Sequence, residues 1–416
     1  MSYKILILDT GKEWGGGTNS LIELLKRSDK NRYIFTVLFY NNYKKGTDSD
    51  IKTEIERLNI KFLLLDHGKQ VVIHMLLKEL ARIVFFFNAK LKRYFIFLID
   101  YSFRIKLNAE KIADTAKRLD IDLLYMNNQP SSNLEGIIAV RDAGIPCVQH
   151  SRIAAMLNAF EVDAVNKWLK KMICVSEGVR ESFVRQGINE SICTVVYNGI
   201  DPNIKPMRAV SEIRKKWGVA EDEILIGTVG SLIKRKRVND LIEAVAEMQR
   251  QDARGKMQDL KLATCNLKLS LKCMIVGDGP EKENLQIEAR KKGLHERVIF
   301  TGFQSDAISY INVMDIFVLS SENEGLPRVI LEAMLMAKPV VACNVTGSSE
   351  LVIDGETGFL VSVKDPDALA AAMSRLIASS ELRNTMGAMG RERVLEKFSM
   401  EAYITGVSKI FEEVLG

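Results

Sequence analysis

Ser320-Ser-Glu-Asn-Glu-Gly-Leu-Pro-Arg-Val-Ile-Leu-Glu-Ala-Met-Leu-Met-Ala-Lys338 is the stretch that decides the fold, and it follows an apolar run, residues 316–319, that predicts a buried strand. Pro327 suits the first position of a helix, where its missing N–H is not needed. The helix expected after it is apolar on every side, which predicts burial. Glu332 in that helix and Glu324 in the loop before it need hydrogen-bond donors if they are buried. Because helix-start N–H groups suit a phosphate, the stretch predicts a polar ligand with hydroxyls and phosphate, held between the two carboxylates.

Bulk composition bounds the class of protein. A chain of 416 residues with 47% apolar residues predicts two or three domains, each with its own core. A net charge of +5 is too small to indicate nucleic-acid binding without a clustered basic patch. The six cysteines are scattered without a C-x-x-C pair, as in a cytosolic protein with reduced thiols, and the four histidines lack the spacing of metal ligands. We expect no signal peptide and no spanning helix, and therefore a cytoplasmic protein without a metal site.

The first half of the chain alternates strands and helices. A strand over residues 5–8 leads into the glycine-containing loop 9–17 and a helix over 18–26. Such a loop lets the backbone approach a ligand, but a merely flexible turn is the alternative, since the G-x-G-x-x-G pattern is missing. The strand 145–150 ends in His150, at the carboxyl edge where parallel sheets bind ligands; a histidine satisfied within the fold is the alternative.

Residues 76–106 combine aromatic and basic side chains. They contain three consecutive phenylalanines and the run Tyr-Phe-Ile-Phe-Leu-Ile, opposed by two acidic residues, Glu79 and Asp100. The interleaved basic residues are Lys78, Arg82, Lys90, Lys92, Arg93, Arg104 and Lys106. A segment of this kind can lie on an anionic membrane surface. The alternative is one or two core helices with solvated basic faces.

The second half repeats the strand–loop–helix pattern. Residues 198–206 hold two prolines and a glycine, which is typical of a linker. A strand over 224–229 is followed by a loop, 230–237, with four consecutive basic residues that suit a diphosphate; a solvated charge run is the alternative. Residues 249–270 are polar and irregular, as in a surface excursion. Two alternating halves predict an α/β protein with two doubly wound, Rossmann-like domains and ligand binding at the carboxyl ends of the strands.

Glu324 and Glu332 form an E-x7-E pattern that resembles family 4 of the retaining glycosyltransferases, which have the GT-B fold. Further segments match blocks of that family in the same order: 198–201, 229–230, 236, 276–280, 300–302, 320–333, 339–342, 347–350 and 355–359. The resemblance is strong over residues 195–416, fair over the first 30 residues and 120–195, and absent over about 45–118. It implies an acceptor-binding domain over 1–200, a nucleotide-sugar-binding domain over 201–396, and a final helical segment, 397–416, that crosses back to the first domain.

The resemblance also implies roles for residues of the second domain. Glu324 would hydrogen-bond the donor sugar, and Glu332 would hold the ribose hydroxyls of the nucleotide. The backbone of Gly325, Leu326 and Pro327 would approach the sugar or phosphate. Lys236 matches the family lysine that grips the donor diphosphate.

Other implied site residues lie in the glycine loop, at His150 and beside Lys236. Gly16 and Gly17 match the family's glycine loop near the diphosphate and acceptor, and His150 matches a histidine near the donor sugar. Ser231 stands where the family has an arginine, so Arg235 or its neighbour Lys234 is expected to supply that diphosphate contact. The predicted catalytic residues are thus Glu324, His150 and Lys236, and no nucleophile or general base is assigned.

The activity that the resemblance implies is metal-independent, retaining transfer of a hexose-type sugar. The donor would be a nucleotide sugar such as a UDP- or GDP-sugar, used as substrate, with no cofactor. The acceptor would be a glycan, and the basic and aromatic segment 76–106 suggests that it is lipid-linked at the inner face of a bacterial membrane, in capsule, exopolysaccharide or lipopolysaccharide synthesis. A nucleotide-sugar epimerase and a non-catalytic nucleotide-sugar-binding subunit are the alternatives. No nucleic-acid partner is expected.

Overall fold

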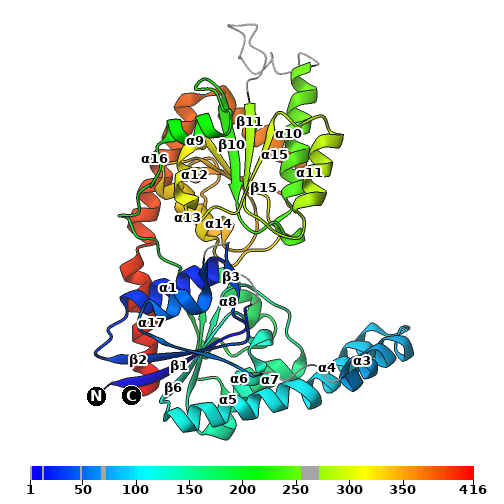
Figure 1. Cartoon of the computed structure of the whole chain (residues 1–416), viewed down its shortest axis with the longest axis vertical. Coiled ribbons are helices and arrows are strands. Elements are labelled where there is room, and N and C mark those ends of the chain that lie inside the picture. Colours follow the sequence, from blue (N-terminus) through cyan, green and yellow to red (C-terminus); the bar gives the residue numbers. More distant parts are fainter. Residues whose placement is uncertain (1, 12–13, 47–48, 67–71, 254–270) are drawn as a thin grey trace. The chain divides into compact units, whose positions relative to one another are not determined.

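The computed structural model describes residues 2–11, 14–46, 49–66, 72–253 and 271–416 (Figure 1). The chain forms two compact units: unit 1 comprises Met1–Cys174, Arg180–Val196 and Gly406–Gly416, and unit 2 comprises Val175–Val179 and Tyr197–Thr405. The chain passes into unit 2 at Tyr197, whereas the sequence analysis places this boundary after residue 200. The end of the final helix belongs to unit 1.

Unit 1 is built on a parallel sheet of seven strands among the described residues. Its spatial order is β5 (Lys61–Leu64), β2 (Tyr33–Phe39), β1 (Tyr3–Asp9), β6 (Leu123–Asn127), β7 (Cys147–Ser151), β8 (Lys171–Cys174) and β9 (Cys193–Val195). The central strands β1, β6 and β7 are almost entirely buried, as expected for apolar runs in a sheet covered on both faces. The predicted strands over 5–8 and 123–126 are confirmed.

Unit 1 also contains helices, several of which begin or end at the residues that the sequence indicates. They are α1 (Gly16–Arg27), α2 (Ile51–Glu56), α3 (Val72–Val84), α4 (Ala89–Asp100), α5 (Lys106–Leu119), α6 (Leu134–Ala143), α7 (Ala159–Trp168) and α8 (Glu177–Val184), the last with residues in both units. Helix α6 ends at the predicted Gly144, whose left-handed φ of 72° costs little without a side chain. Two short strands, β3 (Lys44–Lys45) and β4 (Ser49–Asp50), pair antiparallel.

The aromatic and basic segment forms a helical hairpin, residues 72–100, that projects from the body of unit 1 (Figure 1). Helix α4 continues through a π-helical turn, Tyr101–Ile105, into α5. The prediction of helices is confirmed, but they are not core helices, because α4 has no buried residue and α3 exposes most of its apolar side chains. Within the described residues, no helix has the length and apolarity that crossing a bilayer requires.

Unit 2 is built on a second parallel sheet, six-stranded within its described residues. The order is β12 (Val298–Gly302), β11 (Leu271–Val276), β10 (Ile224–Val229), β13 (Ile316–Leu319), β14 (Val340–Cys343) and β15 (Gly358–Val361). Helices α10 (Val238–Ala253), α11 (Lys282–Lys291) and α15 (Pro366–Ala378) cover one face (Figure 1). The other face is covered by α9 (Val210–Lys216), α12 (Ala307–Val313), α13 (Arg328–Leu335) and α16 (Ser380–Lys397). The short α14 (Ser348–Leu351) and the final α17 (Met400–Leu415) complete the fold.

Two details of unit 2 differ from the sequence-based expectation. Helix α13 begins at Arg328, and Pro327 is its N-cap in an extended conformation (φ −71°, ψ 110°), so the prediction that Pro327 is the first helical residue is wrong by one position. The prediction of an irregular segment from residue 249 is wrong for 249–253, which continue α10, where Arg250 and Gln251 pair with Glu247 one turn earlier. The rest of the predicted excursion, 254–270, lies outside the described residues. The linker segment 198–206 has no helix, and Ile200 bridges to Ser399.

Candidate active site

Two loops at the carboxyl ends of neighbouring strands form the charged centre of unit 2. Strands β10 and β13 pair directly, which brings the loop after β10 against the loop after β13 although they are far apart in sequence. Lys236 ends a 3-10 turn (Lys234–Lys236), and its Nζ lies 2.6 Å from Glu324 Oε1. Arg235 lies 3.6 Å from Glu324 Oε2 and donates a hydrogen bond to the Asn323 carbonyl. Three predicted site residues, Lys236, Arg235 and Glu324, are therefore in mutual contact.

The carboxylate of Glu324 is buried and is kept charged by these two cations. Burial alone would raise its pKa, but the charges of Lys236 and Arg235 and the Lys236 hydrogen bond outweigh that effect. The result is a pKa below the ordinary value for glutamate. The carboxylate of Glu324 is thus ionised and paired with both cations.

The second carboxylate of the E-x7-E pair, Glu332, has a different environment. Its ion-pair partner is Arg328, whose Nε lies 3.9 Å from Oε1, and among the described residues no hydrogen bond to this carboxylate is seen. Its side chain is only 13% exposed, and this burial raises its pKa. Arg328 is itself buried and donates to the Gly199 carbonyl. The expectation that Glu332 needs donors is not met within the described part of the chain, which leaves its oxygens available to a ligand.

The loop between the two glutamates is fixed by main-chain contacts. A Cβ on Gly347 would lie 1.9 Å from the Gly325 carbonyl oxygen, and the backbone there has a left-handed φ of 78°, so glycine is required on two counts. Asn198 donates to the Leu326 carbonyl at 3.1 Å. Gly325, Leu326 and Pro327 are all buried. Their backbone is therefore held in place before any ligand arrives.

Ser231 lies beside Lys236 in a pocket at the end of β10. The pocket is lined by Thr228, Val229, Gly230, Ser231, Leu232, Lys236, Val238 and Leu319. A Cβ on Gly277, where φ is 141°, would meet the Gly230 carbonyl oxygen at 1.9 Å, so this loop is also braced through the backbone. Arg235 and Lys234, the two residues expected to replace the family arginine, do not line this pocket. Arg235 pairs with Glu324, and Lys234 is exposed.

The predicted residues of unit 1 lie at the carboxyl edge of its sheet. Gly16 is the first residue of α1, and a Cβ on Gly17 would touch Arg152 Cγ at 3.4 Å. His150 is buried, and its Nδ1 lies 2.5 Å from the hydroxyl of Tyr125. Burial, assisted by the charge of Arg152, lowers the pKa of His150 well below its ordinary value, so the imidazole is neutral at physiological pH.

A buried polar cluster beside His150 escaped the sequence analysis. Asp9, Asn127 and His150 are successive neighbours in the register of β1, β6 and β7. Asp9 accepts hydrogen bonds from the Gly11 amide at 2.6 Å and the Asn127 side chain at 2.6 Å, and Asn127 in turn accepts one from Arg152 Nε at 2.7 Å. The sequence contained a signal for this cluster, because each of these apolar strands ends in polar residues.

No cluster of three or more histidine, cysteine, aspartate or glutamate side chains suited to a metal ion occurs in residues 2–11, 14–46, 49–66, 72–253 and 271–416.

Comparison with known proteins covers both units. The family model described as Glycosyltransferase Family 4 matches residues 14–204, and the one described as Glycosyl transferases group 1 matches residues 209–393. The chain is 25% identical over 320 residues to N-acetyl-alpha-D-glucosaminyl L-malate synthase of Bacillus anthracis, covering 74% of this chain and 78% of that protein. It is 30% identical over 250 residues to the capsular polysaccharide biosynthesis glycosyltransferase CapM of Staphylococcus aureus, covering 59% of this chain and 60% of CapM.

Solved structures resemble the chain over nearly its whole length. The crystal structure of Anabaena Alr3699/HepE in complex with UDP-glucose matches with a TM-score of 0.75 at 23% identity and covers 99% of both chains. A glycosyltransferase from Rickettsia africae matches with a TM-score of 0.76 at 18% identity and covers 100% of this chain and 99% of that chain. At these identities the likeness shows the fold, and the predicted pair of Rossmann-like domains of the GT-B type is confirmed. Since the two family models together span most of its length, the chain belongs to the glycosyltransferases, with family 4 in its first half and group 1 in its second.

Proposed function

We propose that this glycosyltransferase transfers a sugar from a nucleotide sugar to a glycan of a bacterial envelope polysaccharide, with retention of anomeric configuration and without a bound metal or cofactor. The observation that carries the donor site is the contrast within unit 2 between Glu324, paired with Lys236 and Arg235, and Glu332, which is buried without a close donor. A sugar nucleotide supplies the missing groups: an anion for the cations and hydroxyls for both carboxylates.

The cations of the site would change partners when the donor binds. In the free protein, Lys236 neutralises Glu324 at 2.6 Å. A diphosphate near the pocket that Lys236 and Ser231 line competes for the lysine, since phosphate and ammonium form strong charge-assisted hydrogen bonds. Glu324 then accepts hydrogen bonds from the sugar, and Glu332 from the ribose. Arg235 stays close to Glu324 and compensates its charge in both states.

The chemistry follows from stabilising the leaving group. The bond between the anomeric carbon and the phosphate oxygen breaks, and Lys236 with the backbone of the 325–327 loop stabilises the charge that develops on the diphosphate. The acceptor hydroxyl attacks from the face that the phosphate leaves, which retains configuration, and the departing phosphate takes up its proton. His150 is neutral and buried, so we assign it to positioning near the donor sugar and not to carrying charge.

The class of acceptor is inferred from relatives and from the hairpin. CapM is named for capsular polysaccharide biosynthesis, and EpsD of Bacillus subtilis, 30% identical over 266 residues and matched over 65% of its length, is named a putative glycosyltransferase. LpsE of Rhizobium meliloti, 31% identical over 195 residues, is named for lipopolysaccharide core biosynthesis. The hairpin of residues 72–100 exposes apolar side chains that suit a membrane surface. From these names and the hairpin together, we propose a lipid-linked glycan acceptor at the cytoplasmic side of the membrane.

A donor screen followed by matched variants tests this function. UDP-glucose, UDP-N-acetylglucosamine and GDP-mannose are added to the full chain in buffer with EDTA, and the thermal midpoint is measured, because a ligand specific to the folded state raises it. Glu324→Gln and Lys236→Met are expected to lose the shift and sugar transfer to bacterial membrane extracts, while Lys205→Met, at an exposed lysine of unit 2 outside the assigned site, retains both. The anomeric configuration of the product is read by NMR.

Several results would overturn the proposal. Transfer undiminished in both Glu324→Gln and Lys236→Met removes the assigned site. An isomer of the nucleotide sugar formed without acceptor indicates an epimerase. Tight donor binding without turnover on any membrane extract indicates a non-catalytic subunit. A requirement for added metal, or an inverted product, contradicts the corresponding part of the mechanism.

A further inference from the structure

The helical hairpin of residues 72–100 holds a polar cluster and an aromatic pair between its two helices and exposes most of its other apolar side chains. Between α3 and α4, His74 Nε2 and Lys78 Nζ each lie 2.9 Å from Asp100 Oδ1. Phe85 and Phe95 stack at a centroid distance of 4.2 Å. These contacts fix which face of each helix turns inward. A hairpin that is stable in water alone would bury its apolar side chains instead.

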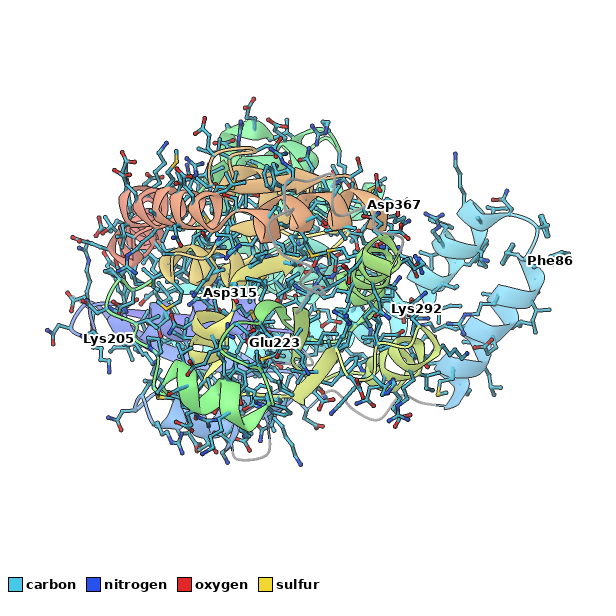
Figure 2. The ribbon with its side chains drawn as sticks, turned by 90° about the horizontal axis from the view of Figure 1, so that it is seen from above. Phe86, Lys205, Glu223, Lys292, Asp315 and Asp367 are labelled. Carbon is cyan, nitrogen blue, oxygen red and sulfur yellow. The ribbon has the colours of Figure 1, made fainter. Side chains whose placement is uncertain are left out.

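The outer face of α3 is a continuous apolar stripe. Its members are spaced by three or four residues, which places them on one side of a helix. They are Ile73, Leu76, Leu77, Leu80, Ile83, Val84 and, just beyond the helix, Phe87, with exposed fractions from 36% to 69%. Phe86, 77% exposed, lies at the outer end of the hairpin (Figure 2). Helix α4 adds Leu91, Tyr94 and Leu98. Contiguous exposed apolar side chains of this kind mark an interaction site.

Unpaired basic residues accompany the apolar stripe. Lys78 is paired with Asp100 and Arg82 with Glu79, but within the described part of the chain no ion pair is formed by Lys90, Lys92 or Arg93. Residues 72–100 hold five basic and two acidic residues, which gives this segment a net charge of +3. A second copy of the chain would bring like charges together around the same patch, whereas an anionic surface complements them.

We propose that this hairpin, through the apolar stripe of α3 and the basic residues of α4, docks the protein on an anionic lipid bilayer. The apolar side chains enter the boundary between headgroups and acyl chains, and the lysines and Arg93 remain at the level of the lipid phosphates. The hairpin would lie at the surface, since none of the described helices is long and apolar enough to cross a bilayer. Docking of this kind would bring the enzyme to the lipid-linked acceptor proposed above, but it does not depend on that acceptor.

Vesicle binding of the full chain tests the proposal without any sugar substrate. The protein is sedimented with vesicles of phosphatidylcholine alone and of phosphatidylcholine with phosphatidylglycerol. We expect binding to the anionic vesicles that weakens with added salt, because exposed charges are screened. Lys90→Gln and Arg93→Gln are each expected to weaken binding about fivefold. Leu80→Ser combined with Ile83→Ser is expected to weaken it by about tenfold or more.

Matched controls separate the hairpin from general surface effects. Met156 and Met207 are 84% and 77% exposed outside the hairpin, so Met156→Ser combined with Met207→Ser removes comparable apolar surface. Lys205→Gln removes one exposed basic charge from unit 2 (Figure 2). All substituted side chains are exposed, so circular dichroism is expected to show unchanged folding. The control variants are expected to bind vesicles like the unaltered protein.

Three outcomes would overturn the docking proposal. One is equal binding to neutral and anionic vesicles, and another is full binding by the Leu80→Ser and Ile83→Ser double variant. The third is self-association of the unaltered protein in sedimentation velocity that this double variant abolishes, which identifies the stripe as an interface between copies. Donor-induced thermal shifts are measured on the same samples, so a failure of docking is distinguished from a failure of the proposed transferase activity.

Discussion

Replacing Lys236 by methionine is expected to destabilise the protein because it leaves Glu324 as a buried charge with weaker compensation. The Lys236 and Glu324 side chains are only 17% and 9% exposed, and their charged atoms are 2.6 Å apart. Removing one partner of a buried ion pair costs about 3–5 kcal/mol. Arg235 remains at 3.6 Å from the carboxylate and offsets part of the loss, so we expect the low end, about 3 kcal/mol, at neutral pH.

The pH dependence and a double variant identify the cause of this loss. In the unaltered protein the pKa of Glu324 is lowered, so its contribution to stability is present above the unfolded pKa and is lost as pH falls through the folded pKa. In Lys236→Met, burial prevails and raises that pKa, so stability is lost as pH rises through it. The gap between the two proteins should therefore narrow from neutral pH to about pH 5.

Urea unfolding at both pH values measures the effect. Lys236→Met combined with Glu324→Gln removes the uncompensated charge and should recover stability to within about 1 kcal/mol of the unaltered protein. Lys234→Met, at an exposed lysine of the same turn, is the control. The electrostatic reasoning is refuted if the double variant is no more stable than Lys236→Met, or if the gap does not change with pH.

Two further tests probe the rest of the donor site. Glu332→Gln should raise the free energy of unfolding by about 1 kcal/mol at neutral pH, because the pKa of Glu332 is raised and its ionisation therefore lowers stability as pH rises through that pKa. The same substitution should weaken nucleotide-sugar binding. An unchanged free energy in urea unfolding would contradict the first expectation, and an unchanged affinity in calorimetry would contradict the second. Gly347 and Gly355 have the same left-handed backbone conformation, with φ of 78° and 79°, but a Cβ would reach the Gly325 carbonyl at Gly347 alone of these two positions. Gly347→Ala should therefore lower the free energy of unfolding by at least about 2 kcal/mol more than Gly355→Ala does. Equal midpoints for the two alanine variants would show that the contact is unimportant.

Local pattern sufficed for most of the fold, and it failed where tertiary contacts decide. Apolar runs bounded by glycine or polar loops predicted the bounds of β10 and β13 correctly. A parallel strand that is buried on both faces requires such a continuous apolar run. Pro327 was misplaced by one position, since φ alone is compatible with both an N-cap and a first helical residue, and ψ depends on how the loop packs. The sequence did not determine that the apolar face of α3 points outward. Periodicity shows which residues share one face of a helix, but it does not show what covers that face.

The candidate site divides in the same way. The positions of Glu324, Lys236 and Glu332 followed from the resemblance to a family, but their pairing did not. Contact between Lys236 and Glu324 depends on β10 lying beside β13, which is a property of strand order. The cluster of Asp9 and Asn127 likewise exists because β1 lies beside β6.

The braced loops of unit 2 bear on how enzymes of this kind diversify. The Gly325 carbonyl rests against Gly347, and the Gly230 carbonyl rests against Gly277. Because backbone contacts backbone at both places, the conformation of these loops does not depend on the side chains that surround them. A lineage can therefore exchange residues that select a particular sugar or base, one substitution at a time, while the scaffold beneath them stays constant.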